Sequence, residues 1–528
     1  AVGKGSMDSN TTGSDNIAMG EASLQANTTA SSNTALGGGG CMYYNTTGDS
    51  NVAVGQAALK DNTTAASNTA VGSYALTNNT TGADNSALGR GAMEDNTTGT
   101  LNVAVGNFAL GNNTTGSNCV AVGRSALRNN TSAANNTAVG YQALGETTTG
   151  ASNTAVGHGA LDTNTTGANN IAMGVECMDA NTTGSYNVAL GKNAMRLNTT
   201  ASNNTAVGFE ALELNTTGAE NVAVGQRALE ANTTADGNVS VGYYALSATT
   251  TGASNSALGG RALQNNTTGA ENTGLGWGAL YANTTASYNT SVGANSLYTN
   301  TTGANNSALG FNALKLNTTG HSNTAVGKGA GDTITTGISN TVIGFDAGDA
   351  ITSAGENCAL GESALGALTT GAANIGIGSA AATNTILLTT GTRNIFLGTY
   401  AHGSAADADD EIVIGYQVGS AATSSLTFGK STTDSNIAFG ATTITAPSDV
   451  RLKEDIQDEE VGLSFINDLR PVTFRWKKEK DVPSEMRAHV AGSEERVMNG
   501  KYNHGFIAQE VKEVIDNHGL KDGFDMWT

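Results

Sequence analysis

A seventeen-residue phrase, Asn-Thr-Ala-Val-Gly-His-Gly-Ala-Leu-Asp-Thr-Asn-Thr-Thr-Gly-Ala-Asn at residues 153–169, recurs with variations along most of this 528-residue chain. The glycine that ends its first five residues falls at positions 3, 20, 37, 55, 72 and onward to 378. Every interval is seventeen residues long, except the eighteen residues between Gly37 and Gly55. A fixed period of this size predicts a solenoid in which each repeat forms one coil of a rod.

The residues before each glycine predict a short β-strand, because they are often β-branched and are bounded by turn-forming residues. The fourth position of the phrase is almost always Val, Leu, Met or Ile, and we expect it to point into the core, as at Val71, Val105 and Val139. The small third position lies on the opposite face of the strand. We expect it to face close-packed backbone, which in a trimer is a partner chain near the axis, as at Ala70, Ala104 and Ala138.

The second half of the phrase supplies another core layer and a turn. We expect the Ala-Leu pair, such as Ala160-Leu161, to form that layer in a single helical turn. Asn-Thr-Thr-Gly then reverses the chain, with Gly or Asn at positive φ. Coils stacked at ~4.8 Å would give a rod of roughly 105 Å, with Asn and Thr side chains hydrogen-bonded between coils as ladders. A disordered low-complexity tract is the alternative, but the apolar positions recur too regularly for it.

Composition and charge exclude several classes of function. The net charge is −20, which argues against a nucleic-acid partner, and no apolar run is long enough for a membrane helix. Four cysteines are too few for a disulfide framework, and Cys177 and Cys358 merely replace repeat residues. No calcium-binding nonapeptide and no recurrent carboxylate pair is present, so we predict no metal and no cofactor. The chain opens partway through a coil, and we expect it to be a fragment.

The repeat predicts three regions. Residues 1–378 form the regular array, and residues 379–447 have irregular, shrinking intervals that predict a tapering stalk or neck. Residues 448–528 contain 12 Lys and Arg and 17 Asp and Glu, a far higher charge density than the rest of the chain. In this last region we expect a small α+β domain, with a helix at 461–469, a strand at 472–476 and a second helix over about 505–517.

Three blocks in this last domain resemble one known family. They are Ser-Asp-Val-Arg-Leu-Lys at 448–453, Leu-Arg-Pro-Val-Thr-Phe-Arg-Trp at 469–476 and Gly-Phe-Ile-Ala-Gln-Glu-Val at 505–511. Their order and content resemble the intramolecular chaperone domain of endosialidases and phage tail fibres, from Ser448 to about Asp516. Family members usually continue into further helical sequence beyond this point, so we expect the domain to be C-terminally incomplete.

The resemblance implies a homotrimeric, self-cleaving Ser-Lys chaperone that helps three β-rich chains to wind together. Carried over, Ser448 is the nucleophile, Lys453 is its partner, and the cut lies between Ser448 and Asp449. A lysine can serve as the base if desolvation lowers its pKa. The competing interpretation is that Ser448 only caps the following segment and that Lys453 is solvated.

A second, longer period occurs at the position after each repeat glycine. Bulky residues occur there every thirty-four residues, with smaller or polar ones between: Tyr141, Val175, Phe209, Tyr243, Trp277 and Phe311. The aromatic members form a candidate glycan-binding stripe, because aromatic rings can stack on sugars. Packing between coils or protomers is the alternative. The Asn-Thr-Thr turns also match the glycosylation sequon, and regular threonines are compatible with an ice-binding face.

The sequence therefore predicts an all-β solenoid rod of 17-residue coils, homotrimeric, followed by a small α+β chaperone domain. The favoured function is a structural and adhesive viral tail fibre, located on the virion, that contacts a host-surface glycan or receptor and whose C-terminal domain is released by autoproteolysis. The rival is an ice- or polysaccharide-binding module, and an enzymatic rod comes third.

Overall fold

The computed structural model describes residues 1–431, 435–440, 463–484, 486, 488–497 and 500–518. The chain divides into two compact units, residues 1–446 and 447–528. Each unit is described by itself.

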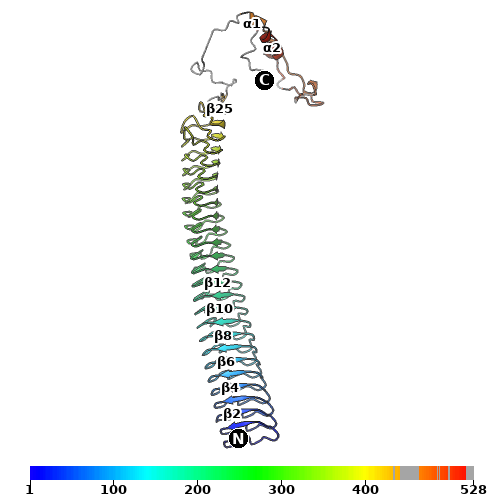
Figure 1. The fold of residues 1–528 in the computed structure, drawn as a ribbon, viewed down its shortest axis with the longest axis vertical. Helices are drawn as coiled ribbons and strands as arrows, with labels where there is room; N and C mark the ends of the chain where they lie inside the picture. Colours follow the sequence, from blue (N-terminus) through cyan, green and yellow to red (C-terminus); the bar gives the residue numbers. More distant parts are fainter. Residues whose placement is uncertain (432–434, 441–462, 485, 487, 498–499, 519–528) are drawn as a thin grey trace. The chain divides into compact units, whose positions relative to one another are not determined.

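The first unit is a β-solenoid, as the period predicts. One short strand per coil pairs in parallel with the strand of the next coil, in a register set by the repeat, such as Thr137 with Thr154 and Ala138 with Ala155. Figure 1 shows these strands stacked one above the next from the N-terminal end. At the C-terminal end of the stack, β25 (Ser425–Lys430) pairs in parallel with β24 (Ile412–Tyr416) and in antiparallel with β26 (Ser435–Ala438).

The strands of the solenoid are β1 (Ile17–Met19), β2 (Thr34–Leu36), β3 (Val52–Val54), β4 (Thr69–Val71), β5 (Ser86–Leu88), β6 (Val103–Val105), β7 (Val120–Val122), β8 (Thr137–Val139), β9 (Thr154–Val156), β10 (Ile171–Met173), β11 (Val188–Leu190), β12 (Thr205–Val207), β13 (Val222–Val224), β14 (Val239–Val241), β15 (Ser256–Leu258), β16 (Thr273–Leu275), β17 (Thr290–Val292), β18 (Ser307–Leu309), β19 (Thr324–Val326), β20 (Thr341–Ile343), β21 (Cys358–Leu360), β22 (Ile375–Ile377), β23 (Ile395–Leu397), β24 (Ile412–Tyr416), β25 (Ser425–Lys430) and β26 (Ser435–Ala438).

The face of each strand that meets the core is the opposite of the one expected. The small third position points inward and is fully buried, as at Ala70, Ala104 and Ala138. The larger fourth position points outward: Val71 and Val105 are half-buried and Val139 is exposed. The prediction that these valines line the core, and that the alanines face a partner chain, is therefore wrong. The coil interior is narrow, and the buried leucines of the turn leave room only for a methyl group beside them.

The Ala-Leu pair does supply the core, but not through a helical turn. Ala160 and Leu161 are fully buried, and Leu161 adopts the left-handed conformation with φ of 54°. The amide N–H of Leu161 donates to the carbonyl of Cys177 in the next coil at 3.0 Å. The same left-handed leucine or methionine recurs in nearly every coil, so the turn is repeated rather than accidental. A non-glycine residue in this region costs of order 1 kcal/mol, and full burial of the side chain offsets that cost.

The repeat glycine is required by close approach between coils. Gly157 has φ of 141°, and a Cβ placed there would lie 2.3 Å from the carbonyl oxygen of Gly174. The glycine of the Asn-Thr-Thr-Gly turn, in contrast, does not take the positive φ that was expected. The left-handed residue lies two positions later, immediately before the strand asparagine, as at Asn169 with φ of 58°.

Two asparagine ladders run through the solenoid, as predicted. In the turn ladder, which contains the first residue of each Asn-Thr-Thr, Nδ2 of Asn96 donates to Oδ1 of Asn79 at 2.7 Å. In the strand ladder, which contains the residue before each strand, the backbone N–H of Asn170 donates to Oδ1 of Asn153 at 2.9 Å. Beyond the half-buried Asn10 and Asn16 of the first coil, the asparagines of both rows are buried, so their amides need these partners.

The threonine ladder is also present, although its acceptor is the backbone rather than another threonine side chain. The hydroxyl of Thr97 donates to the carbonyl of Thr114 at 2.9 Å, and the same contact recurs along the rod. The second threonine of each turn, such as Thr98, is exposed.

The second unit contains α1 (Leu463–Asp468), β27 (Val472–Phe474), a short 3-10 turn at Glu479–Asp481, β28 (Asn503–Gly505) and α2 (Ala508–Asn517). The two predicted helices and the predicted strand are confirmed, with shorter bounds. β27 and β28 form an antiparallel pair that was not predicted.

Candidate functional site

The β27–β28 pair joins two of the three blocks that the sequence singled out. Val472 of the Leu-Arg-Pro block is the register partner of Gly505, the first residue of the Gly-Phe-Ile block. Thr473 lies opposite His504, and their side chains are 3.0 Å apart, from Oγ1 to Nδ1. Segments some thirty residues apart in sequence are thus fixed next to each other.

An ion pair ties the same two blocks together a second time. Nε of Arg470 donates to Oε2 of Glu510 at 3.0 Å, and the second guanidinium nitrogen contacts Oε1. The hydrogen bond from Arg470 lowers the pKa of the Glu510 carboxyl. Both side chains are exposed, so the pair adds little to the free energy of folding. Its two-point contact mainly fixes how the two blocks are oriented.

The ends of the two helices also meet. Nε2 of His518 lies 2.8 Å from Oδ2 of Asp468, and the ring of Phe465 packs edge-on against the His518 ring with centroids 5.6 Å apart. His518, the residue directly after α2, therefore contacts α1 through one polar and one aromatic interaction.

A cavity of about 430 Å³ is lined mostly by apolar groups from the segment between β27 and β28. Trp476, Val482, Pro483, Met486 and Val497 contribute to its wall. Close by, Lys478 and Lys480 both contact Glu494, and their hydrogen bonds lower the pKa of Glu494 to about 2.

The residues predicted to carry the chemistry, Ser448, Asp449 and Lys453, lie outside the described residues. The structure accordingly brings together the second and third blocks, while the distance between the predicted nucleophile and its predicted base stays untested.

Comparison with known proteins identifies the C-terminal segment. Residues 448–520 match the model of the peptidase family described as chaperone of endosialidase. This C-terminal segment is therefore similar to the chaperone-of-endosialidase family. No match was found among curated proteins, and none among solved structures. The family match begins at Ser448 and includes all three blocks, so the resemblance inferred from them is confirmed.

The chaperone-of-endosialidase segment follows a β-solenoid in the same chain, a combination consistent with proteins of the phage tail-fibre and endosialidase type. Within the described residues, no helix is long and apolar enough to cross a membrane.

The aromatic stripe of the rod lies on the surface. Tyr141, Phe209, Tyr243, Trp277 and Phe311 are all exposed, with Trp277 the most accessible at 52%. Side chains from neighbouring coils cover part of the surface of one of these rings. The ring of Tyr141 stacks on His158 at 5.3 Å, with the Arg124 guanidinium over the ring at 5.7 Å from its centroid.

Stacked rings also occur at turn positions that the sequence interpretation left unassigned. Tyr298 stacks between Trp277 and Tyr281, with centroid distances of 6.5 and 4.9 Å. The signal was present in the sequence, since Tyr281 and Tyr298 are seventeen residues apart and therefore lie at adjacent levels.

Three carboxylates on one side of the rod come within 4.8 Å of one another: Glu210, Glu213 and Glu230. Arginines engage them. Arg227 lies 2.7 Å from Glu210, and Arg196 lies 2.9 Å from Glu213. Burial raises the pKa of Glu230. With cations already in contact with it, the cluster is an ion-pair network.

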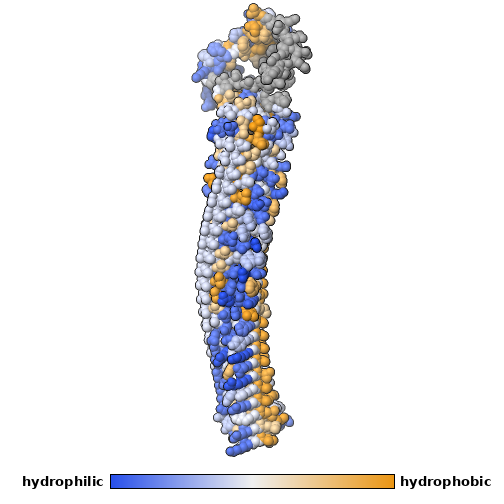
Figure 2. Space-filling view, turned by 90° about the vertical axis from the view of Figure 1, so that its left-hand side faces the viewer, coloured by the Kyte–Doolittle hydropathy of each residue, from blue (hydrophilic) through white to orange (hydrophobic). Residues whose placement is uncertain are grey.

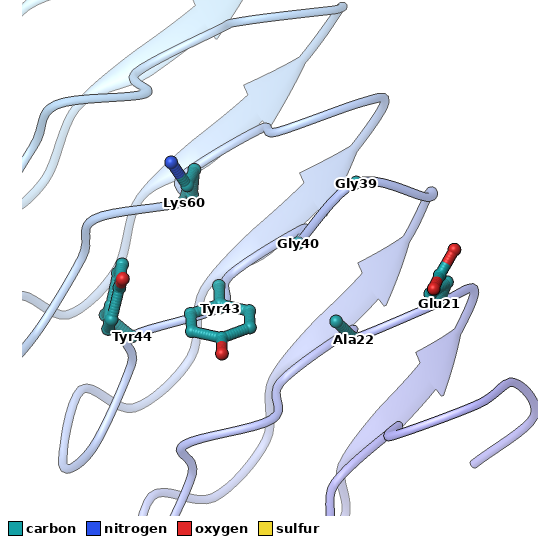
Figure 3. Close-up of a pocket in the computed structure, with 7 residues that line it drawn as sticks. All are labelled: Glu21, Ala22, Gly39, Gly40, Tyr43, Tyr44 and Lys60. Atoms are coloured by element: carbon teal, nitrogen blue, oxygen red, sulfur yellow. The ribbon is translucent and has the colours of Figure 1, made fainter.

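The single eighteen-residue interval produces a surface pocket of about 290 Å³. Figure 3 shows Tyr43, Tyr44 and Lys60 toward one end of the pocket and Glu21 at the other. The two tyrosine rings meet edge to face, with centroids 4.6 Å apart. The extra residue lies among Gly38, Gly39 and Gly40, so the irregular interval was a usable signal for the pocket's position.

Proposed function

We propose that this chain is the rod of a viral tail fibre that assembles as a homotrimer, with a C-terminal domain that assists folding and is then released by autoproteolysis. The observation that carries the proposal is the chaperone-of-endosialidase match, which begins at Ser448 directly after a β-solenoid. A solenoid of stacked coils suits a fibre, because each coil contacts only its neighbours and length is gained by adding repeats. In this proposal the protein lies on the virion and reaches a receptor on the host surface.

The proposed cut follows Ser448. The Ser448 hydroxyl adds to the scissile carbonyl carbon, and Lys453 in its neutral form accepts the hydroxyl proton and passes it to the Asp449 nitrogen as the C–N bond breaks. Water then hydrolyses the resulting ester, so that one peptide bond is hydrolysed with the net uptake of one water. A lysine is neutral near pH 7 only when burial lowers its pKa, so the cut is expected to follow folding. Each chain then cleaves itself once.

The described contacts support a folded chaperone segment. The β27–β28 pair and the Arg470–Glu510 ion pair hold the second and third blocks in one arrangement. A frame of this kind is what a one-time cleavage site needs, because the nucleophile and its base must meet in a fixed geometry.

Electrophoresis of the expressed chain beside Ser448→Ala and Lys453→Ala variants tests the autoproteolysis. We expect two bands from the wild type, a rod ending near Ser448 and a fragment of roughly eighty residues, and one band from each variant, because nucleophile and base act as a unit. Thr473→Ala, a change in the same unit but outside the predicted dyad, serves as the control and should still be cut. Cleavage of Ser448→Ala at the same bond would refute the mechanism.

The exposed aromatic stripe favours a second candidate function, recognition of a host-surface glycan by the rod. Trp277 and Tyr243 present accessible rings two coils apart. Glycan-array binding that is lost in Trp277→Ala and Tyr243→Ala, and kept in Tyr186→Ala, would support it. Tyr186 is a suitable control because it is an exposed aromatic outside the stripe. Thermal hysteresis in solutions of the wild-type rod would instead favour ice binding by the exposed threonine row.

A further inference from the structure

One face of the solenoid carries an unbroken row of aliphatic side chains. The outer strand face consists of the first and third residues of strands β1 to β23, which flank the buried middle residue. The third residue is Val, Leu, Met or Ile in every one of these strands. Several of these side chains are half exposed, including Met19, Leu88 and Leu309 at 51% each. A row of aliphatic side chains is therefore partly exposed to solvent along the outside of the solenoid.

The outer strand face contains no charged residue. Its first positions are Thr, Ser, Val, Ile or Cys, although the chain as a whole carries a net charge of −20. Figure 2 shows apolar residues gathered along one side of the lower rod, next to hydrophilic surface. Soluble monomers rarely expose apolar patches beyond a few hundred Å², and larger ones mark contact surfaces.

The size of this face suits a permanent interface. If the outward side chains expose about a third of their surface, the face amounts to on the order of 2,000 Å² per chain, against about 800 Å² per partner for a standard stable interface. Shallow hollows between the side chains are also present. One, of about 380 Å³, is lined by Val239, Val241, Leu258 and Leu275.

We propose that two further copies of this chain cover the outer strand face, in a parallel trimer with coils at equal levels. The inference rests on the homotrimer of the proposed function and assigns its contact surface. Only a chain with the same repeat keeps its side chains in step with this row over more than twenty coils. The lack of charge lets identical chains meet without like-charge repulsion, whereas the variable turns carry the charged residues.

This proposed contact surface differs from the one predicted from the sequence, in which the small middle residue of each strand faces a partner chain. Ala70, Ala104 and Ala138 are sealed inside their own coils, so they cannot touch a partner. In the proposed trimer, the partner chains instead contact the outward-pointing neighbours of these alanines, such as Val71 and Val105. The trimer is thereby built from solenoids that are each closed, rather than from chains that share one core.

Cysteine cross-linking of the full chain tests this surface directly. Cys358 is the first residue of β21 and lies on the outer strand face, whereas Cys41, Cys119 and Cys177 are buried. Under mild oxidation we expect disulfide-linked dimers through Cys358 in the wild type, and additional ones in Val139→Cys. Thr149→Cys, on the exposed turn of the next coil boundary, should add none. Cross-linking that is equal at Val139→Cys and Thr149→Cys, or absent at both and at Cys358, would overturn the assignment.

Charge insertion gives a second, independent measurement. The double change Val139→Lys and Leu309→Lys places like charges of three copies together, so we expect light scattering to fall from three chains to one at concentrations where the wild type is trimeric. The control pair is Thr149→Lys and Thr319→Lys, and circular dichroism checks that both proteins keep their solenoid. A trimer that survives both changes would refute this surface and leave the proposed trimer standing. A wild-type monomer would refute both.

Discussion

Within the described part of the rod, the side-chain oxygen Oδ1 of Asn130 has no hydrogen-bond partner, and the residue one coil further along is Thr147 instead of asparagine. The same loss occurs at Asn232, before Thr249, and at Asn317, before Ile334. Each interruption of the turn ladder therefore leaves the preceding carboxamide without its usual donor. An unpaired buried polar atom costs about 1–3 kcal/mol.

Restoring the ladder should stabilise the rod. Thr147→Asn supplies a donor to Asn130 and an acceptor to Asn164, whose Nδ2 now reaches only the Thr147 hydroxyl at 3.5 Å. We expect a gain of about 1 kcal/mol, measured as a higher denaturation midpoint. Thr149→Asn, on the exposed surface of the same turn, is the control and should change little. An unchanged or lower midpoint for Thr147→Asn would show that the ladder does not act as described.

The repeat glycine and the glycine two positions later should respond very differently to substitution. Gly157→Ala forces a Cβ onto the Gly174 carbonyl, so we expect a loss of more than about 2 kcal/mol. Gly159 has φ of 63° and nothing nearer than 3.8 Å to its added Cβ, and other coils hold Gln142 or Glu176 at the same place. Gly159→Asn should therefore change stability by less than about 1 kcal/mol. Equal effects of the two changes would contradict the close approach of the coils.

A half-buried carboxylate, Asp162, gives the rod a defined pH response. Burial, with Asp179 and Glu146 nearby, raises the pKa of Asp162 to about 6. The folded state therefore binds the proton more tightly than the unfolded state, so this group lowers stability as pH rises from about 4 through about 6. We expect Asp162→Asn to raise the melting temperature at pH 7 and to weaken its decline over that window. A melting temperature of the variant that falls as steeply as that of the wild type would count against this assignment.

The ion pair between the two chaperone blocks can be tested by exchanging its charges. Arg470→Glu alone places two carboxylates together and should lower the yield of folded protein, while Arg470→Glu with Glu510→Arg should recover it. The readout is the soluble yield and, where the cut occurs, the cleaved fraction. The i,i+4 pair of Lys512 and Asp516 in α2 provides a matched exchange that should leave both readouts unchanged. A double variant as poor as the single one would indicate that the contact does not form.

The sequence predicted the architecture well, because a period of seventeen residues leaves little choice but stacked coils. The ladders followed from that period, whereas α1, β27 and α2 were predicted from local hydrophobic patterns in the second unit. The inward face of the strand was predicted wrongly, because both Ala70 and Val71 are apolar and hydrophobicity alone favours the larger one. The coil is narrow and Leu76 already fills its interior, so only the small Ala70 side chain fits on the inward face of the strand. The left-handed leucines could not be predicted, since leucine rarely adopts that conformation.

The candidate site depended on a different kind of information. The three blocks identified the chaperone segment by resemblance, but residue order alone did not reveal that Thr473 lies opposite His504 or that Arg470 meets Glu510. Such pairings are set by long-range strand register, which short motifs do not encode. The interruptions of the turn ladder at Thr147 and Thr249 were visible in the sequence, and they acquire meaning only once the coils are stacked.

The mass of the assembled particle tests the central claim, a homotrimeric fibre rod, most directly. Multi-angle light scattering on the purified full chain measures that mass without reference to shape. We expect a particle of three chains, whether or not the C-terminal segment has been released. A folded rod that remains a single chain at micromolar concentration would contradict the account.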